Sequence, residues 1–169
     1  MISPTIRIVE VAPRDGLQNE KKISLDRKVR FINALSQTGL NEIEAGAFVS
    51  PRAIPQMGDS EAVFQNIIRK KGVLYSALVP NAQGLDRALK CKVDKIAVFT
   101  AASQVFNQRN IHATIAQSLQ RVKEVLSQSL KLKLPTRGYI STAFHCPFEG
   151  PIAPNVTLRL ALELLALGV

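Results

Sequence analysis

Hydrophobic residues along this chain alternate between two kinds of spacing. Between strand-like runs lie stretches whose apolar residues recur every three or four positions, as in Leu25, Val29, Ile32 and Leu35. The short apolar runs that read as strands are 5–11, 41–46, 73–79, 95–100 and 137–143. A strand followed by a helix, repeated along the chain, favours a parallel sheet with helices packed outside it.

The helical stretches have ends that the sequence indicates. Ser24 can cap the first helix and Gly39 stops it. A second helix is predicted from Asp59 to Gly72, with Val63, Ile67 and Ile68 on one face, and a third over about 83–91. One long helix follows, with the stripe Ile111, Ile115, Leu119, Val122 and Leu126. The last helix, 156–167, has two apolar faces: Leu158, Leu162 and Leu165, and Leu160, Leu164 and Leu167.

This pattern predicts an α/β protein, and specifically part of a TIM-type (β/α) barrel. A complete eight-stranded barrel typically needs about 250 residues, whereas the chain has 169. We therefore expect residues 1–169 to form a single domain, a truncated barrel of about five parallel strand-helix units. Three further units of the barrel are expected to be missing.

Composition limits the partners of the chain. Its formal net charge is +9, but Lys and Arg are scattered, Trp is absent and few aromatic residues lie among them, so nucleic acid is not an expected partner. The charge suits a small anionic ligand instead. No apolar run approaches the roughly 20 residues that span a membrane. The first strand begins close to Met1, and the two cysteines form no CxxC pair, so a cytoplasmic location is expected.

The first strand runs into the most informative segment, 9–20. It ends in Arg14 and Asp15, and Gly16 permits a sharp exit of the backbone. A fixed guanidinium and a carboxylate at one rim of a sheet could hold a divalent cation and stabilise a developing enolate together. Taken alone, the segment would favour a surface turn with an ion pair; together with the rest of the chain it does not.

Other polar residues also follow or end the predicted strands, where a parallel barrel has its site. Glu44 lies in an apolar strand, so it needs a partner; it is either part of the site or a salt-bridge partner of Arg14 or Arg137. Asn81 and Ser103, considered singly, are more typical of helix caps. The full set at the strand ends is Arg14, Asp15, Gln18, Glu44, Asn81, Ser103, Arg137, Tyr139 and Ser141.

Several motifs together resemble the 3-hydroxy-3-methylglutaryl-CoA lyase family, in register over essentially the whole chain. They are 14–20, 43–44, 47–51, 55–59, 79–81, 99–103, 137–141 and 146–150. The resemblance implies a (β/α) barrel that cleaves 3-hydroxy-3-methylglutaryl-CoA to acetyl-CoA and acetoacetate with Mg²⁺ or Mn²⁺. It implies that Asp15 is a metal ligand and that Arg14 is catalytic and stabilises the enolate oxygen. The residues expected to bind the acyl-CoA substrate are Arg14, Gln18, Glu44 and Ser141.

The chain also departs from that family. The family completes its metal site with a His-x-His pair and an asparagine, and uses a cysteine in a glycine-rich loop. Here His112, at the start of the long helix, and His145, in a loop, form no such pair. Cys146 is not that cysteine and is interpreted as a packed thiol. Cys91, late in a helix, is interpreted as a core or surface residue without a chemical role. We therefore expect the chain alone to bind metal or CoA anions weakly without turnover.

Two alternatives stay open at this point. One is a related metal-dependent aldolase or acyl-CoA synthase, which a substrate screen would separate from the lyase. The second is a non-catalytic half-barrel fragment that binds CoA-type anions or pairs with another half-barrel, which lyase turnover by the purified chain with Mg²⁺ would exclude. Homo-oligomer formation is also left open.

Overall fold

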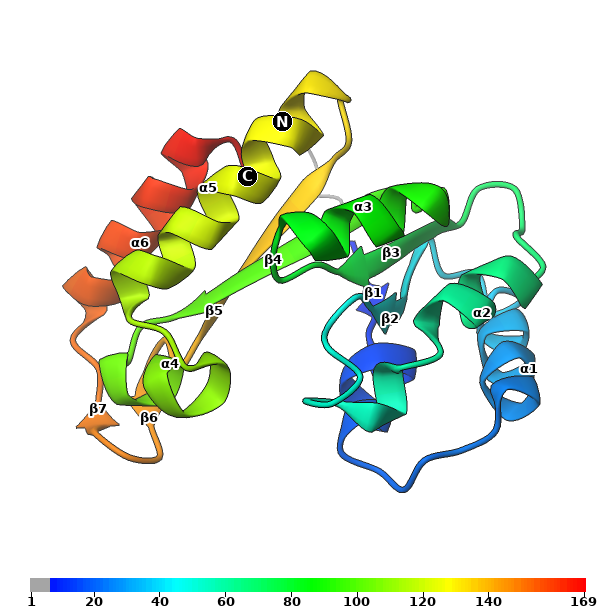
Figure 1. Cartoon of the computed structure of the whole chain (residues 1–169), viewed down its shortest axis with the longest axis horizontal. Coiled ribbons are helices and arrows are strands. Elements are labelled where there is room, and N and C mark those ends of the chain that lie inside the picture. Colours follow the sequence, from blue (N-terminus) through cyan, green and yellow to red (C-terminus); the bar gives the residue numbers. More distant parts are fainter. Residues whose placement is uncertain (1–6) are drawn as a thin grey trace, which may run out of the picture. The chain divides into compact units, whose positions relative to one another are not determined.

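The predicted alternation of strands and helices is present in residues 7–169, the part of the chain that this computed structural model describes (Figure 1). The chain forms two units: residues up to Leu78 with Asp86–Lys95, and Val79–Leu85 with Ile96–Val169. The chain passes between the units at Leu78–Val79, within helix α3 (Ala82–Lys90), and at Lys95–Ile96. Each unit is described in turn, and the expectation of a single domain stays a prediction.

The first unit contains three parallel strands. β1 (Val9–Glu10) pairs with β2 (Glu42–Ala47), and β2 pairs with β3 (Leu74–Leu78). Every residue of β2 is buried, as expected for a strand covered on both faces. The first strand was predicted over 5–11, and 5–6 lie outside the described residues. It ends at Glu10 because the chain then enters a π-helical turn, η1 (Ala12–Gly16).

The helices of the first unit are α1 (Leu25–Leu35), a 3-10 turn η2 (Pro55–Met57) and α2 (Ser60–Asn66). The predicted cap of α1 is confirmed, because Ser24 Oγ accepts a hydrogen bond from the Arg27 backbone N–H. The prediction that the second helix reaches Gly72 is wrong. It ends at Asn66, and Ile67 is already extended, with φ −68° and ψ 145°.

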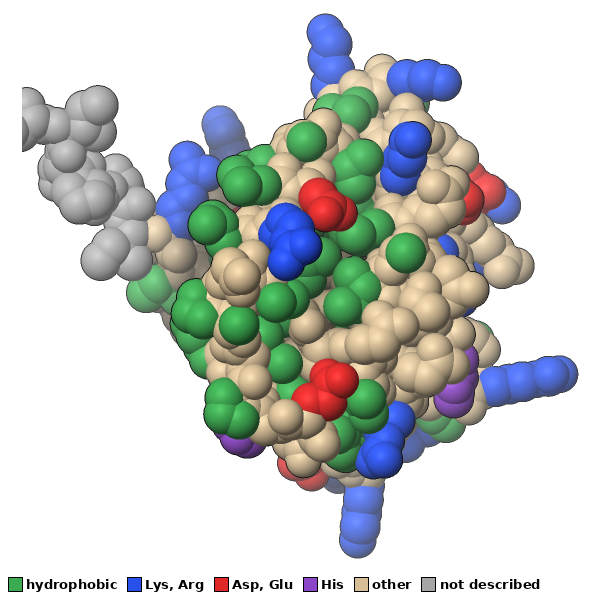
Figure 2. All heavy atoms as spheres, turned by 90° about the vertical axis from the view of Figure 1, so that its left-hand side faces the viewer, with side chains coloured by type: hydrophobic (Ala, Val, Ile, Leu, Met, Phe, Trp, Pro, Cys, Tyr) green, Lys and Arg blue, Asp and Glu red, His purple; other side chains and the backbone are tan. Residues whose placement is uncertain are grey.

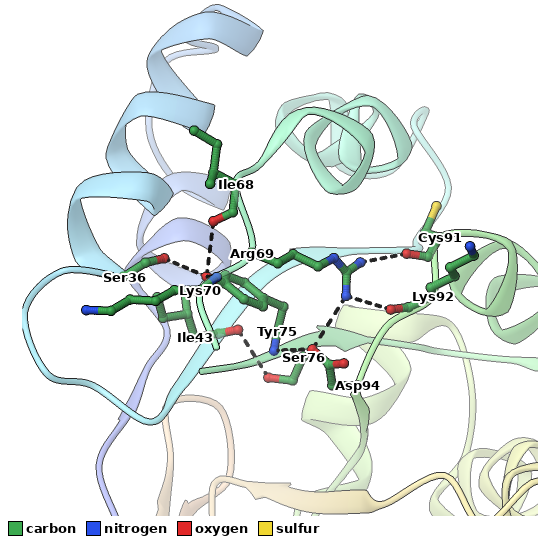
Figure 3. A network of polar contacts seen from close by, with 10 residues as sticks. All are labelled: Ser36, Ile43, Ile68, Arg69, Lys70, Tyr75, Ser76, Cys91, Lys92 and Asp94. Atoms are coloured by element: carbon green, nitrogen blue, oxygen red, sulfur yellow. Dashed lines mark hydrogen bonds and ion pairs between the residues drawn. The ribbon is translucent and has the colours of Figure 1, made fainter. Parts of the chain in front are cut away.

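Tertiary contacts explain why that helix stops early (Figure 3). The buried hydroxyl of Tyr75 accepts a hydrogen bond from the Lys70 N–H at 3.0 Å and contacts Ser36 Oγ at 2.8 Å. Arg69 donates to the carbonyl oxygens of Cys91 and Lys92 at 2.8 and 2.7 Å. These contacts hold residues 68–70 outside any helix, and a helix there would break them.

The second unit carries the remaining larger elements. β4 (Lys95–Ala101) pairs with β5 (Thr136–Ser141) in parallel, as predicted. The loop predicted over 145–154 contains a small antiparallel hairpin, β6 (His145–Cys146) with β7 (Gly150–Pro151). The helices are α4 (Gln104–Ile111), α5 (Ile115–Lys131) and α6 (Pro154–Leu167).

The single long helix predicted to include Ile111 is in fact two helices. Ile111 ends α4, and His112 follows as its C-cap with a left-handed φ of +48°. Thr114 then caps α5 in a capping box with Gln117. His112 therefore lies at the end of α4 instead of at the start of the long helix, and it is exposed as expected.

The two apolar faces predicted for the last helix have different environments. Leu160 and Leu164 of α6 are buried, whereas Leu158, Leu162 and Leu165 are exposed. Figure 2 shows hydrophobic side chains gathered on the side of the second unit where α6 lies. In the described part of the chain, no helix has both the length and the apolar character needed to cross a membrane.

Gly46 of β2 provides a test of packing in the first unit. A Cβ atom at Gly46 would lie 2.8 Å from Ser60 Oγ, which itself accepts from the Ala47 N–H and donates to the Met57 carbonyl. We expect Gly46→Ala to lower the free energy of unfolding by about 1–3 kcal/mol through overpacking, measured by urea denaturation. Gly16→Ala, whose Cβ would meet only Ala12 Cβ at 3.6 Å, is the control; an equal effect would contradict this account.

Candidate active site

The turn that follows β1 presents Arg14 and Asp15 to different environments. The backbone N–H groups of Arg14 and Asp15 both donate to the Val11 carbonyl, at 3.0 and 2.7 Å. Pro13 suits the start of this turn because its φ is already fixed near the helical value. In this turn the Arg14 side chain is only 10% exposed, whereas the Asp15 side chain is 53% exposed.

Arg14 forms ion pairs with two carboxylates. Its Nε donates to Oε1 of Glu44, whose side chain is 1% exposed in the middle of β2. Its Nη1 donates to Asp15 Oδ1 at 2.7 Å. The expected salt bridge between Glu44 and Arg14 is therefore present, and it brings Glu44 to the same rim as the Arg14–Asp15 pair. A substrate-binding role for Glu44 stays a prediction.

Gln18 completes the group in the first unit. Its Nε2 donates to Asp15 Oδ1 at 3.1 Å. The guanidinium of Arg14 and the amide of Gln18 thus both contact the same oxygen of Asp15. The four predicted residues of this unit, Arg14, Asp15, Gln18 and Glu44, form one continuous chain of polar contacts.

Ser141 belongs to the second unit, at the last position of β5. Its carbonyl accepts hydrogen bonds from the Ala102 N–H at 2.9 Å and from Thr142 Oγ1 at 2.7 Å. Arg137 and Tyr139 lie earlier on the same strand. The predicted meeting of Ser141 with the Arg14 group stays a prediction.

Asn81 and Ser103 have the structural roles that were considered typical of such residues. Asn81 Oδ1 accepts from the Gly84 N–H at 2.9 Å, and Ser103 Oγ accepts from the Phe106 N–H at 2.9 Å. Ser103 also donates to Glu149. The contact with Glu149 could not be predicted from the sequence, because an acidic residue in a loop rich in Pro and Gly is usually exposed to solvent.

Both cysteines are buried, as the interpretation of Cys146 as a packed thiol requires, and Cys91 is a core residue instead of a surface one. Burial raises the pKa of the Cys91 thiol, and the nearby Glu61 carboxylate raises it further. Cys146 Sγ lies 3.0 Å from Ser103 Oγ and 3.4 Å from the Phe148 N–H. Burial opposes ionisation of Cys146, but these hydrogen bonds outweigh it and lower its pKa.

Carboxylates that could hold a metal ion are few at this rim. Within residues 7–169, no group of three or more His, Cys, Asp or Glu side chains is gathered so that it could hold a metal ion. Asp15 is nevertheless an exposed carboxylate, and it is the residue type that hard divalent cations prefer.

Comparison with known proteins shows close relatives over almost the whole chain. The chain is 47% identical over 164 residues to the cytoplasmic 3-hydroxy-3-methylglutaryl-CoA lyase of Rattus norvegicus, covering 96% of this chain and 48% of the rat protein. It is 46% identical over 164 residues to the 3-hydroxy-3-isohexenylglutaryl-CoA/hydroxy-methylglutaryl-CoA lyase of Pseudomonas aeruginosa, covering 96% of this chain and 55% of that protein. The chain thus spans about half the length of the curated relatives it matches.

Solved structures give the same result for the fold. The HMG-CoA lyase of Brucella melitensis matches with a TM-score of 0.95 and 43% identity, over 96% of this chain and 58% of that one. A lyase from Acinetobacter baumannii, in complex with coenzyme A and 3-methylmalate, matches with a TM-score of 0.92 and 41% identity, over 96% and 53%. These likenesses confirm the predicted fold class, part of a (β/α) barrel. The family model described as HMGL-like matches residues 5–168, and the chain therefore belongs to the HMGL-like family.

Proposed function

We propose that this chain contributes the Arg14–Asp15 half of the active site of a carbon–carbon lyase. The lyase would cleave 3-hydroxy-3-methylglutaryl-CoA to acetyl-CoA and acetoacetate. The observation that carries the proposal is the buried Arg14 guanidinium, held between Glu44 and the exposed Asp15. The names of the relatives, which are lyases of this substrate, support the same reaction.

The reaction class explains why a fixed cation is useful at this rim. Cleavage of a 3-hydroxy acyl thioester begins when a base removes the hydroxyl proton. The C2–C3 bond then breaks, the hydroxyl-bearing carbon becomes the ketone of acetoacetate, and negative charge develops on the thioester oxygen of the departing acetyl-CoA enolate. An acid finally protonates the enolate carbon to give acetyl-CoA. A guanidinium whose position is set before the reaction stabilises the enolate charge without reorganising during it. The ion pair with Glu44 anchors Arg14 in this way, since Glu44 lies within the buried strand β2.

The family resemblance implies a Mg²⁺ or Mn²⁺ ion, and Asp15 could bind such an ion as a single carboxylate ligand. Both described contacts of its side chain use Oδ1, and the side chain is half exposed. Mg²⁺ keeps several waters when it binds one or two carboxylates, so one ligand supports weak binding. When bound, the cation would polarise the substrate oxygens as a Lewis acid.

Gln18, Glu44 and Ser141 are proposed to bind the acyl-CoA substrate together with Arg14. The structure of the Acinetobacter relative contains coenzyme A and 3-methylmalate, a dicarboxylate. These two ligands together support a CoA thioester as the ligand of this chain. The positive charge of the chain favours the same class of ligand. We also propose a cytoplasmic location, because the rat relative is named as a cytoplasmic enzyme.

Cation binding by the purified chain tests the role of Asp15. We expect weak Mn²⁺ binding, measured by electron paramagnetic resonance, and we expect Asp15→Asn to lower the affinity at least tenfold, because a neutral amide is a poorer ligand for a hard cation than a carboxylate. Asp26→Asn is the matched control, since Asp26 is also exposed and paired with an arginine, Arg30, at 2.9 Å.

Lyase assays on the same proteins test the proposal further. We expect the purified chain to show no measurable cleavage, because its described residues do not gather the ligands that would fix a cation relative to Arg14. Cleavage by the chain that persists in Asp15→Asn would refute the proposed role of this carboxylate.

A further inference from the structure

Lys28 on α1 is a buried cation that the proposed function does not use. Its side chain is only 4% exposed, and lysine is rarely so buried unless it is paired. The Nζ atom lies 2.6 Å from Asp59 Oδ1 and also donates to the backbone carbonyl of Gln56. Both acceptors belong to the stretch that follows β2, residues 50–59, here named the 50–59 loop. Lys28 therefore joins α1 to this loop.

The 50–59 loop in turn holds the segment that carries the candidate site. Gln56 Nε2 donates to the carbonyl oxygen of Glu20 at 3.0 Å. Glu20 lies two residues after Gln18, and its own N–H donates to the Leu17 carbonyl. Lys28 thus fixes the backbone carbonyl of Gln56, and the side chain of the same Gln56 contacts Glu20, just after Gln18.

The loop is also anchored at the end of β2, which makes it a rigid support. Ser60, just after the loop, accepts a hydrogen bond from the Ala47 N–H at 3.1 Å and donates to the Met57 carbonyl at 2.8 Å. With Lys28 on one side and Ser60 on the other, Gln56 is held at a defined distance from Glu20.

We propose that Lys28 is a positioning residue for the Arg14–Asp15 site: its buried ammonium fixes the 50–59 loop, and Gln56 passes that constraint to Glu20 and so to Gln18 and Asp15. This inference rests on the proposed role of Asp15 in cation binding. Lys28 thus acts on the cation through geometry without touching it. Groups that hydrogen-bond directly to a metal ligand typically change affinity 10- to 100-fold when they are removed; Lys28 lies further from the ligand, so its effect is expected at the lower end of that range.

The test uses the purified chain and four variants. Lys28→Met keeps an unbranched apolar side chain of similar length but removes the ammonium, and Gln56→Ala removes the contact with Glu20. Their double variant is the third. Lys95→Met is the matched control, because Lys95 and Glu42 both belong to the first unit and their pair, at 3.0 Å and also largely buried, does not involve the loop.

Two measurements are made on each protein: amide hydrogen exchange of residues 17–22 and Mn²⁺ affinity by electron paramagnetic resonance. We expect Lys28→Met and Gln56→Ala each to speed exchange in this segment and to lower Mn²⁺ affinity about tenfold. The Mn²⁺ affinity of the double variant should be no lower than that of the single variant with the lower affinity, because both changes interrupt the same series of contacts. Lys95→Met should change neither measurement.

Two results would overturn the inference, and they differ in what they mean for the proposed function. If the unmodified chain binds Mn²⁺ and folded Lys28→Met binds it equally well, Lys28 is only structural and the role of Asp15 stands. If the unmodified chain binds no Mn²⁺, the proposed role of Asp15 fails, and the positioning role of Lys28 fails with it. Circular dichroism of each variant confirms that the fold is retained.

Discussion

Changing Arg14 to glutamine in a full-length relative is expected to lower kcat by about 10²–10³-fold, the loss typical of removing one donor to a developing oxyanion. KM should change much less, because the guanidinium acts mainly on charge that forms in the transition state. Steady-state kinetics with 3-hydroxy-3-methylglutaryl-CoA would measure both constants. A rise in KM with unchanged kcat would show that Arg14 only binds substrate.

The ion pair between Arg14 and Glu44 makes a control necessary, since Arg14→Gln also leaves a buried carboxylate without this partner. The double variant Arg14→Gln/Glu44→Gln removes both charges of the pair. It should recover much of the lost stability, but it should not recover turnover. Recovery of turnover by the double variant would mean that the single change acts through folding instead of through the reaction.

The parallel strands and the first helix could be predicted because their signals are local. Alternation of apolar runs and helical stripes indicated the strands, and Ser24 marked the start of α1. The contact of Arg14 with Glu44 could also be anticipated. Glu44 was a carboxylate within an apolar strand and therefore needed a partner, and Arg14 was placed just beyond the end of another parallel strand.

The errors have physical causes that lie outside the local sequence. Ile67 and Ile68 have helical spacing, but the contacts of Tyr75 and Arg69 keep that stretch out of a helix. Helix α4 was missed because its apolar residues do not gather on one face, so no stripe marks it. It is fixed instead by its Ser103 cap and by Asn107, which donates to the buried Ser118 hydroxyl at 3.1 Å.

The support of the candidate site was the part least visible in the sequence. Lys28 and Asp59 are 31 positions apart, and each looks like an ordinary solvated charge at a helix start. Only the fold shows that the lysine is buried and that the loop beyond β2 returns to α1. A buried ion pair between distant elements leaves no periodic signal, unlike an apolar stripe.

Changing Glu44 to glutamine is expected to destabilise the chain itself by about 3 kcal/mol, because removing one member of a buried ion pair typically costs about 3–5 kcal/mol. The 1% exposure of the Glu44 side chain and the 10% exposure of Arg14 place this pair in the buried class. Glutamine keeps the shape of the side chain, so the loss reports the charge and not a cavity. Urea denaturation followed by circular dichroism would measure it.

The matched control is Glu61→Gln. Glu61 pairs with an arginine of the same unit, Arg87, at 2.8 Å, but its side chain is 46% exposed and that of Arg87 is 25% exposed. Partly exposed pairs contribute only about 0–1 kcal/mol, so this variant should unfold at nearly the same urea concentration as the unmodified chain. If the two variants lose equal stability, the burial of Glu44 does not set the strength of its pair, and the view that β2 holds Arg14 rigidly in place is wrong.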